Sequence, residues 1–167
     1  DPVLSSMKRG IGSASLRKLI ANIRRTVPDI AIRTTLIVGY PSEGEREFQE
    51  LLAFVKETAF DRLGVFTYSQ EDGTTAHPLG DPVPQDLKEE RRNLIMEAQQ
   101  EISLKSNESR VGHFLKVLVD RWEGSVAVGR TERDAPEVDN EVTIQNAKEL
   151  RAGEFYDVEI IEAREYD

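Results

Sequence analysis

Residues 32–48 read IRTTLIVGYPSEGEREF, a pattern that predicts a strand leading directly into a helix. The continuous apolar run at 36–38 is typical of a strand that is covered on both faces. Gly39 and Pro41 end this strand, because glycine and proline interrupt regular structure. The acidic residues that follow favour a helix start, where the helix dipole attracts negative charge. Glycine before a helix also lets the backbone approach a ligand closely, although an ordinary strand-to-helix turn has the same pattern.

The flanking sequence repeats this alternation of helix and strand. Apolar residues at helical or strand spacing predict a helix, a strand, a helix and a strand at residues 13–27, 30–40, 42–58 and 63–69. The second helix has two possible N-terminal caps: Ser42 with Glu45, or Gly44. Helices and strands that alternate with short connections indicate a parallel sheet with crossover helices.

A loop at 74–84 precedes a long helix at 85–108, and Pro84 suits the first turn of that helix. The side of this helix that we expect to be buried carries Leu87, Leu94, Ile95, Ala98 and Ile102. Beyond it the pattern changes to short strands with polar connections, at 111–122, 125–131, 138–144 and 155–163. This spacing predicts a small antiparallel β-barrel, and we place the domain boundary near Ser109 and Arg110.

Composition excludes several kinds of site. The 167 residues include no cysteine, so the chain has no disulfide, thiolate nucleophile or cysteine-bound metal. His77 and His113 have no ligand pattern beside them, so we expect no metal. No apolar run is long enough to span a membrane. The net charge of −9 argues against a broad phosphate-binding surface and is compatible with a basic protein partner.

The first region holds too few strand–helix units to close a barrel, and the chain does not begin with methionine. We therefore expect a piece of a longer protein. Its open sheet edge would be paired with the upstream part or covered by oligomer contacts.

Four segments carry a resemblance that runs along essentially the whole chain. They are VLSSMKRG, IRTTLIVGYPSEGEREF, FDRLGVFTYSQEDGTTA and KEERRNLIMEAQQEIS. In order and spacing they resemble the C-terminal half of radical S-adenosylmethionine methylthiotransferases. The resemblance implies an α/β part followed by an all-β part. Residues 1–109 would be the end of a radical-SAM partial TIM barrel with its long closing helix. Residues 110–167 would be a TRAM domain, a small OB-like β-barrel.

The resemblance also implies cofactors and an activity for the intact enzyme. The cofactors would be S-adenosylmethionine and two [4Fe-4S] clusters, whose cysteines would all lie upstream. A 5′-deoxyadenosyl radical would abstract hydrogen from the target before a methylthio group is inserted. Because this chain has no cysteine, we expect it to be inactive alone, and we expect it to bind neither S-adenosylmethionine nor a cluster by itself.

By resemblance, five residues would lie near the S-adenosylmethionine pocket: Arg9, Thr35, Ile37, Gly39 and Tyr68. Thr35, Ile37 and Gly39 alternate and so share one face of their strand. Ile37 and Tyr68 could instead pack in the core, and Arg9 could be an ion-pair partner. Residues 41–44 read Pro-Ser-Glu-Gly where the family usually has Pro-Gly-Glu-Thr. This departure puts a close backbone approach at position 42 in doubt.

The family divides by target into a branch that modifies an adenosine of transfer RNA and a branch that modifies an aspartate of ribosomal protein S-twelve. The transfer-RNA branch usually has a basic residue where this chain has Gln70-Glu71-Asp72, which resembles the ribosomal-protein branch. Residues 108–167 hold 15 acidic and 8 basic residues, a net charge of −7. This is a poor surface for RNA, but it complements a basic protein.

The segment GRTERDAPEVDNEV at 129–142 resembles the ribosomal-protein branch as well. Pro136 restricts the backbone there. We expect the substrate-binding residues to be Arg130, Asp134, Glu137 and Asp139. The carboxylates could accept hydrogen bonds from lysine or arginine of the partner. The alternative is an acidic hairpin that only keeps the domain soluble.

The expected function is transfer of a methylthio group to the β-carbon of an aspartate of ribosomal protein S-twelve, in the cytoplasm. This chain would shape the S-adenosylmethionine pocket and recognise the substrate. Its partners would be S-twelve and the N-terminal half of the same protein, rather than RNA or a membrane. Two alternatives are a transfer-RNA adenosine methylthiotransferase and a nonenzymatic TRAM-type binding module.

Overall fold

The computed structural model describes residues 1–136, 138–145, 147 and 149–165. The chain divides into two compact units, residues 1–99 and 100–167. The division falls inside the long helix, which therefore contributes residues to both units. The domain boundary near Ser109 and Arg110 lies just after that helix and stays a prediction.

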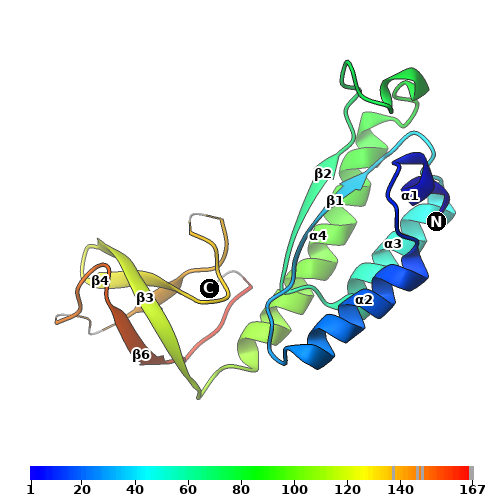
Figure 1. Ribbon diagram of the computed structural model, residues 1–167. Coiled ribbons are helices and arrows are strands. Elements are labelled where there is room, and N and C mark those ends of the chain that lie inside the picture. The colour runs from blue at the N-terminus through cyan, green and yellow to red at the C-terminus, as the bar shows by residue number, and fades with distance from the viewer. Residues whose placement is uncertain (137, 146, 148, 166–167) are drawn as a thin grey trace. The chain divides into compact units, whose positions relative to one another are not determined.

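The first unit has alternating helices and strands (Figure 1). Its elements are α1 (Pro2–Ser6), α2 (Ser13–Thr26), β1 (Arg33–Val38), α3 (Glu45–Thr58), β2 (Arg62–Thr67), the short 3-10 helix η1 (His77–Leu79) and α4 (Gln85–Glu108). Strands β1 and β2 pair in parallel, with Arg33 opposite Arg62 and Val38 opposite Thr67. The parallel pairing and the crossover helix between the strands are confirmed, whereas α1 was not predicted.

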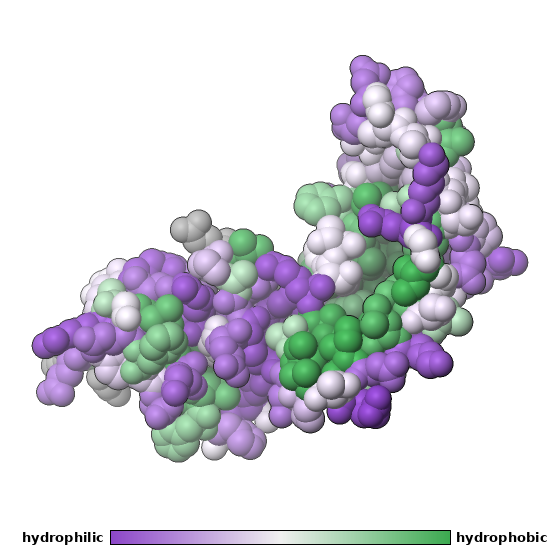
Figure 2. Space-filling model, in the orientation of Figure 1, coloured by the Kyte–Doolittle hydropathy of each residue, from purple (hydrophilic) through white to green (hydrophobic). Residues whose placement is uncertain are grey.

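The helices cover one face of this two-stranded sheet. Ile20, Phe54 and Phe60 form a buried cluster between α2, α3 and the sheet. On the other face Ile37 is 38% and Phe66 is 64% exposed, and Figure 2 shows apolar surface on this unit. Among the described residues the expectation that both faces of the first strand are covered is therefore wrong, because the face that carries Ile37 is partly exposed.

Two helices show how the local sequence sets their ends and faces. Gly44 is the N-cap of α3, and its N–H donates to Glu47 Oε2 at 3.2 Å. On α4, Ile95 and Ala98 are buried as predicted. Leu94, however, is 37% exposed, which corrects its expected burial. The stripe that faces inward instead carries polar residues, namely Lys88, Arg91 and Gln99 together with Ile95.

The second unit contains a four-stranded antiparallel sheet in the order β5-β4-β3-β6. Its strands are β3 (Phe114–Glu123), β4 (Val126–Thr131), β5 (Val142–Ile144) and β6 (Phe155–Glu159). Val117, Val119, Ala127, Ile144 and Ala147 form its core. A β-carbon on Gly129 would lie 2.3 Å from the Leu118 carbonyl oxygen, so only glycine fits this strand position. The antiparallel strands are confirmed, and closure into a barrel stays a prediction.

Candidate functional site

A hollow of about 470 Å³ lies at the carboxyl ends of β1 and β2. Thr35 and Ile37 line it from β1, Phe66 and Thr67 from β2, and residues 68–76 supply further lining. Ligands of open α/β sheets bind at this end of the strands. The volume is in the range of small-molecule sites. The hollow is therefore the first candidate for a ligand site in the described part of the chain.

The structure brings three of the five predicted cofactor residues together. Thr35, Ile37 and Tyr68 all line the hollow. Arg9 is exposed after α1 and is not among the lining residues. Gly39 is buried beside the hollow, and its N–H donates to Glu43 Oε1 at 2.9 Å. That any of the five contacts a cofactor stays a prediction.

Gly39 sits against a lysine of α4. Its φ is +74°, a conformation that favours glycine. A β-carbon there would lie 2.4 Å from Cγ of Lys88. The aliphatic part of Lys88 thus occupies the space beside Gly39, and the close approach of a ligand that the sequence indicated at this glycine stays a prediction.

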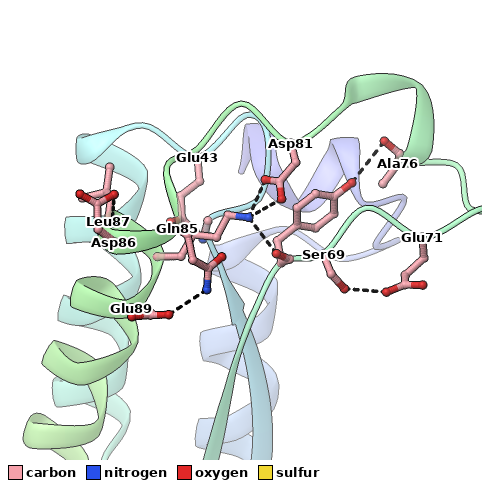
Figure 3. Close-up of polar contacts among 12 residues, drawn as sticks. Glu43, Ser69, Glu71, Ala76, Asp81, Gln85, Asp86, Leu87 and Glu89 are labelled. Carbon is pink, nitrogen blue, oxygen red and sulfur yellow. Dashed lines mark hydrogen bonds and ion pairs between the residues drawn. The ribbon is translucent and has the colours of Figure 1, made fainter.

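Lys88 is buried with its side chain 1% exposed, and it contacts Tyr68, which lines the hollow. Its Nζ donates to the Tyr68 carbonyl at 2.9 Å and to Asp81 at 2.5 Å (Figure 3). The Tyr68 ring packs edge-on against Tyr40, with 5.4 Å between ring centroids. Burial and the nearby Asp81 carboxylate raise the pKa of the Tyr68 phenol. The ammonium group thus bridges the end of β2 to the loop before α4.

A second buried charge pair joins the start of α3 to α4. Arg91 Nη1 donates to Glu43 Oε1 at 2.8 Å and to the Glu43 carbonyl at 3.2 Å. The two side chains are 4% and 3% exposed. Burial raises the pKa of Glu43, against the lowering effects of the Gly39 N–H and the Arg91 charge. Since Glu43 also holds Gly39, this pair fixes the turn after β1.

Sequence reasoning missed the buried ion pairs that join Lys88 to Asp81 and Arg91 to Glu43. One signal could have found the two cations of these pairs. Lys88 and Arg91 lie three residues apart and share a helical stripe with Ile95. A cation on a buried stripe requires a partner, because an unpaired buried charge is costly.

The acidic segment before β5 uses most of its predicted binding residues internally. Arg130 pairs with Asp120 of β3. The Thr131 hydroxyl donates to Asp134 Oδ2 at 2.5 Å. The Ala135 N–H donates to Asp139 Oδ2 at 2.8 Å. Glu137 lies outside the described residues.

The end of the same segment is tied to β3. Arg121 donates from both Nη atoms to the two carboxylate oxygens of Glu141, each at 2.7 Å. A further hydrogen bond of 2.8 Å joins Arg121 to Glu123. The segment is therefore held at both ends by ion pairs to β3.

Two kinds of feature are missing from the residues that the structure describes. Within residues 1–136, 138–145, 147 and 149–165, no cluster of His, Asp and Glu could hold a metal ion. In the same residues no helix has the length and apolarity needed to cross a membrane.

Comparisons with known proteins identify relatives along the whole chain. Residues 111–167 match the TRAM domain family. The full chain is 50% identical to a protein of Chloroherpeton thalassium, over 100% of this chain and 39% of that protein. It is 51% identical to one of Christiangramia forsetii, over 100% and 37%, and 44% identical to one of Aquifex aeolicus, over 100% and 39%.

Each of these three relatives is described as a ribosomal protein uS12 methylthiotransferase RimO. The chain spans about two fifths of the length of these curated relatives. The resemblance to methylthiotransferases that the sequence segments indicated is thereby confirmed.

Proposed function

We propose that this chain, a relative of the RimO methylthiotransferases along its entire length, is part of an enzyme that modifies ribosomal protein uS12. The reaction would add a methylthio group to the β-carbon of an aspartate of uS12. The observation that carries this proposal is sequence identity: about half of the positions of this chain are identical in proteins of that name. The matches cover the candidate hollow and the acidic segment alike, since they extend over 100% of the chain.

The two parts of the chain would have separate roles. Residues 1–109 would supply the last strands and helices of a radical-SAM barrel. The parallel pair β1–β2 and the crossover helix α3 support this assignment. Residues 110–167 would form the TRAM domain, and the family match from residue 111 supports that boundary.

The lining of the hollow fits S-adenosylmethionine in its chemistry. Ile37, Phe66 and Tyr68 offer apolar and aromatic surface for an adenine ring, and Thr35 and Ser69 offer hydroxyl groups. When bound, this cofactor and the iron–sulfur clusters supply the radical chemistry. The chain has no cysteine and so offers no thiolate to a cluster. Its own residues would wall the pocket and orient the cofactor, and the chain alone would be inactive.

The second unit would recognise the substrate by charge. Residues 108–167 carry 15 acidic and 8 basic residues, which complements a basic ribosomal protein. The residues that would contact the partner are Arg130, Asp134, Glu137 and Asp139. Because Asp134 and Asp139 already accept hydrogen bonds inside the loop, they would meet it as a preorganised surface.

A chimaeric enzyme tests the proposed activity. This chain would replace the aligned segment of the Chloroherpeton thalassium relative, and the purified chimaera would be supplied with S-adenosylmethionine, a reductant and uS12. Mass spectrometry should find a methylthio group on an aspartate of uS12. The same parent enzyme lacking the segment is the control. A correctly folded chimaera with loaded clusters that leaves uS12 unmodified would overturn the proposal.

The TRAM match favours RNA binding as a second candidate, since TRAM domains usually bind RNA. Binding of the chain to uS12 and to a transfer-RNA anticodon stem-loop separates the two. We expect uS12 to bind at physiological salt and the stem-loop to bind weakly. Tight stem-loop binding that falls steeply with salt would favour the transfer-RNA branch or a nonenzymatic RNA-binding module.

A further inference from the structure

The loop between β2 and α4 forms one wall of the hollow, yet its side chains are largely exposed. Residues 69–75 are all exposed, and several of them line the hollow. Burial of apolar surface therefore contributes little to holding this wall in place. Polar contacts must do so instead.

The loop is braced internally. Gln70 Nε2 donates to the His77 carbonyl at 2.8 Å, and the Thr74 hydroxyl donates to the Glu71 carbonyl at 2.8 Å. The Ser69 hydroxyl donates to Glu71 at 2.8 Å (Figure 3). A loop braced in this way keeps its own shape, so its position depends on how its two ends are held.

Both ends are held by the same side chain. Lys88 Nζ donates at once to the carbonyl of Tyr68, where the loop begins, and to the carboxylate of Asp81, where it ends. The lysine is itself fixed, because its side chain is 1% exposed and its Cγ fills the space beside Gly39. Its Nζ also lies 5.6 Å from the centre of the Tyr68 ring.

We propose that Lys88 is a positioning residue that clamps both ends of the loop 69–80 and so fixes the loop wall of the hollow and the Tyr68 ring for an adenosyl ligand. The identity of the ligand rests on the proposed function, whereas the clamp rests on the contacts of Lys88 alone. Lys88 would act through the loop and Tyr68 and would not touch the ligand.

Hydrogen exchange of the full chain without ligand tests the clamp. Lys88→Met keeps the aliphatic chain beside Gly39 and removes the ammonium group. Exchange of the backbone amides in residues 69–81 should rise about tenfold or more, since charge-assisted hydrogen bonds are lost. Lys18→Met, at an exposed position of α2, is the matched control and should change nothing there. Unchanged exchange in folded Lys88→Met would overturn the clamp.

Asp81 provides a second route if Lys88→Met does not fold. Its side chain is 33% exposed, so Asp81→Asn is compatible with the fold and should raise exchange at the end of the loop. Asp81→Glu keeps the charge and should restore protection. Equal protection in the wild type and Asp81→Asn would also contradict the clamp.

Titration of the chimaeric enzyme with S-adenosylhomocysteine separates positioning from a purely structural role, and the chimaera that carries the unchanged sequence of this chain serves as the wild type. Lys88→Met and Asp81→Asn should bind this probe about tenfold more weakly than the wild type, whereas Asp81→Glu and Lys18→Met should bind normally. Raised exchange with unchanged affinity would overturn the positioning role. If the wild-type chimaera binds no probe, the cofactor assignment fails, and with it the adenosyl ligand proposed here, whereas the exchange result still decides the clamp.

Discussion

Gly39 has two independent reasons to be glycine, its positive φ and its contact with Lys88. Gly73 offers a matched comparison, because its φ is +75° but a β-carbon would meet nothing within 4 Å. Gly73→Ala should therefore lower the free energy of unfolding by about 1 kcal/mol, from backbone strain alone. Gly39→Ala should lower it by about 1–3 kcal/mol more, because the methyl group collides with Lys88.

Urea denaturation of the two alanine variants and the wild type measures this difference. Repeating both substitutions in a Lys88→Ala background provides the control, since removing the long side chain should abolish most of the extra loss at Gly39. If Gly39→Ala and Gly73→Ala lowered the free energy of unfolding equally in the original background, the Lys88 side chain would be able to move aside without loss of stability.

In the described part of the chain, Arg91 is the charged group that hydrogen-bonds the buried Glu43 carboxylate. Arg91→Met should destabilise the protein by about 3–5 kcal/mol at pH 8, because it leaves a buried carboxylate unpaired. The pKa of Glu43, already raised by burial, should then rise further. A raised pKa in the folded state gives stability that is present below the unfolded value of 4.5 and is lost as pH rises through the folded pKa.

The destabilisation by Arg91→Met should accordingly be smaller at pH 5 than at pH 8, as measured by urea denaturation at both values. Arg92→Met, at an exposed position of the same helix, is the charge-matched control. If Arg91→Met lowered the free energy of unfolding equally at both pH values, Glu43 would either not titrate in this range or find another partner.

At the scale of whole elements, local sequence predicts much of the first unit. The bounds of α4 follow from Pro84 and the polar residues that begin it, and they agree with the structure. The inward face of α4 could not be predicted from apolar spacing, because Lys88 and Arg91 occupy buried positions and find their partners in distant loops. Likewise the hollow depends on the pairing of β1 with β2, which brings Ile37 opposite Phe66.

The segment between β4 and β5 illustrates the same limit in the second unit. Its charges and Pro136 are visible in the sequence, and they indicated a partner-binding surface. The sequence does not reveal that Arg130 pairs with Asp120, since that contact depends on the register of β3 and β4. Nor does it reveal that Arg121 pairs with Glu141, since that contact also depends on the pairing of β4 with β5. Whether the segment also contacts a partner stays a prediction.

The paired hydrogen bonds from Arg121 to the Glu141 carboxylate, called the fork below, make the end of this segment sensitive to acid. Hydrogen bonds from Arg121 hold the pKa of Glu141 below its usual 4.5. A depressed pKa in the folded state means that the stabilisation is present above 4.5 and is lost as pH falls through the folded value. Arg121→Met should therefore move the titration midpoint of Glu141 back towards 4.5. NMR of the Glu141 carboxyl carbon as a function of pH measures this midpoint.

Lys116→Met removes the same charge from an exposed position of β3 and is the control for a general electrostatic effect. It should leave the Glu141 midpoint nearly unchanged, because screening at physiological salt limits interactions between distant exposed charges. Equal shifts in both variants would assign the lowered pKa to the overall field instead of the fork.

At the scale of the whole molecule, charge is distributed unevenly along the chain. Residues 108–167 account for −7 of the net charge of −9. The first unit supplies the hollow, and the second supplies the acidic surface. This division agrees with the proposed function, in which the cofactor and the basic substrate would be bound by different parts of the chain.

The acidic segment should therefore influence partner binding in a way that depends on salt. Asp134→Asn with Asp139→Asn removes two charges, yet each amide oxygen can still accept from the Thr131 hydroxyl or the Ala135 N–H. Binding of uS12 should weaken about threefold to tenfold at low salt, mainly through slower association. The effect should shrink at physiological salt, where exposed charges are screened within about 8 Å.

Glu90→Gln with Glu97→Gln, at exposed positions of α4, is the charge-matched control and should change binding less. Equal effects of the two double variants would assign the attraction to net charge alone, and no effect at any salt would leave the segment as a solubilising hairpin.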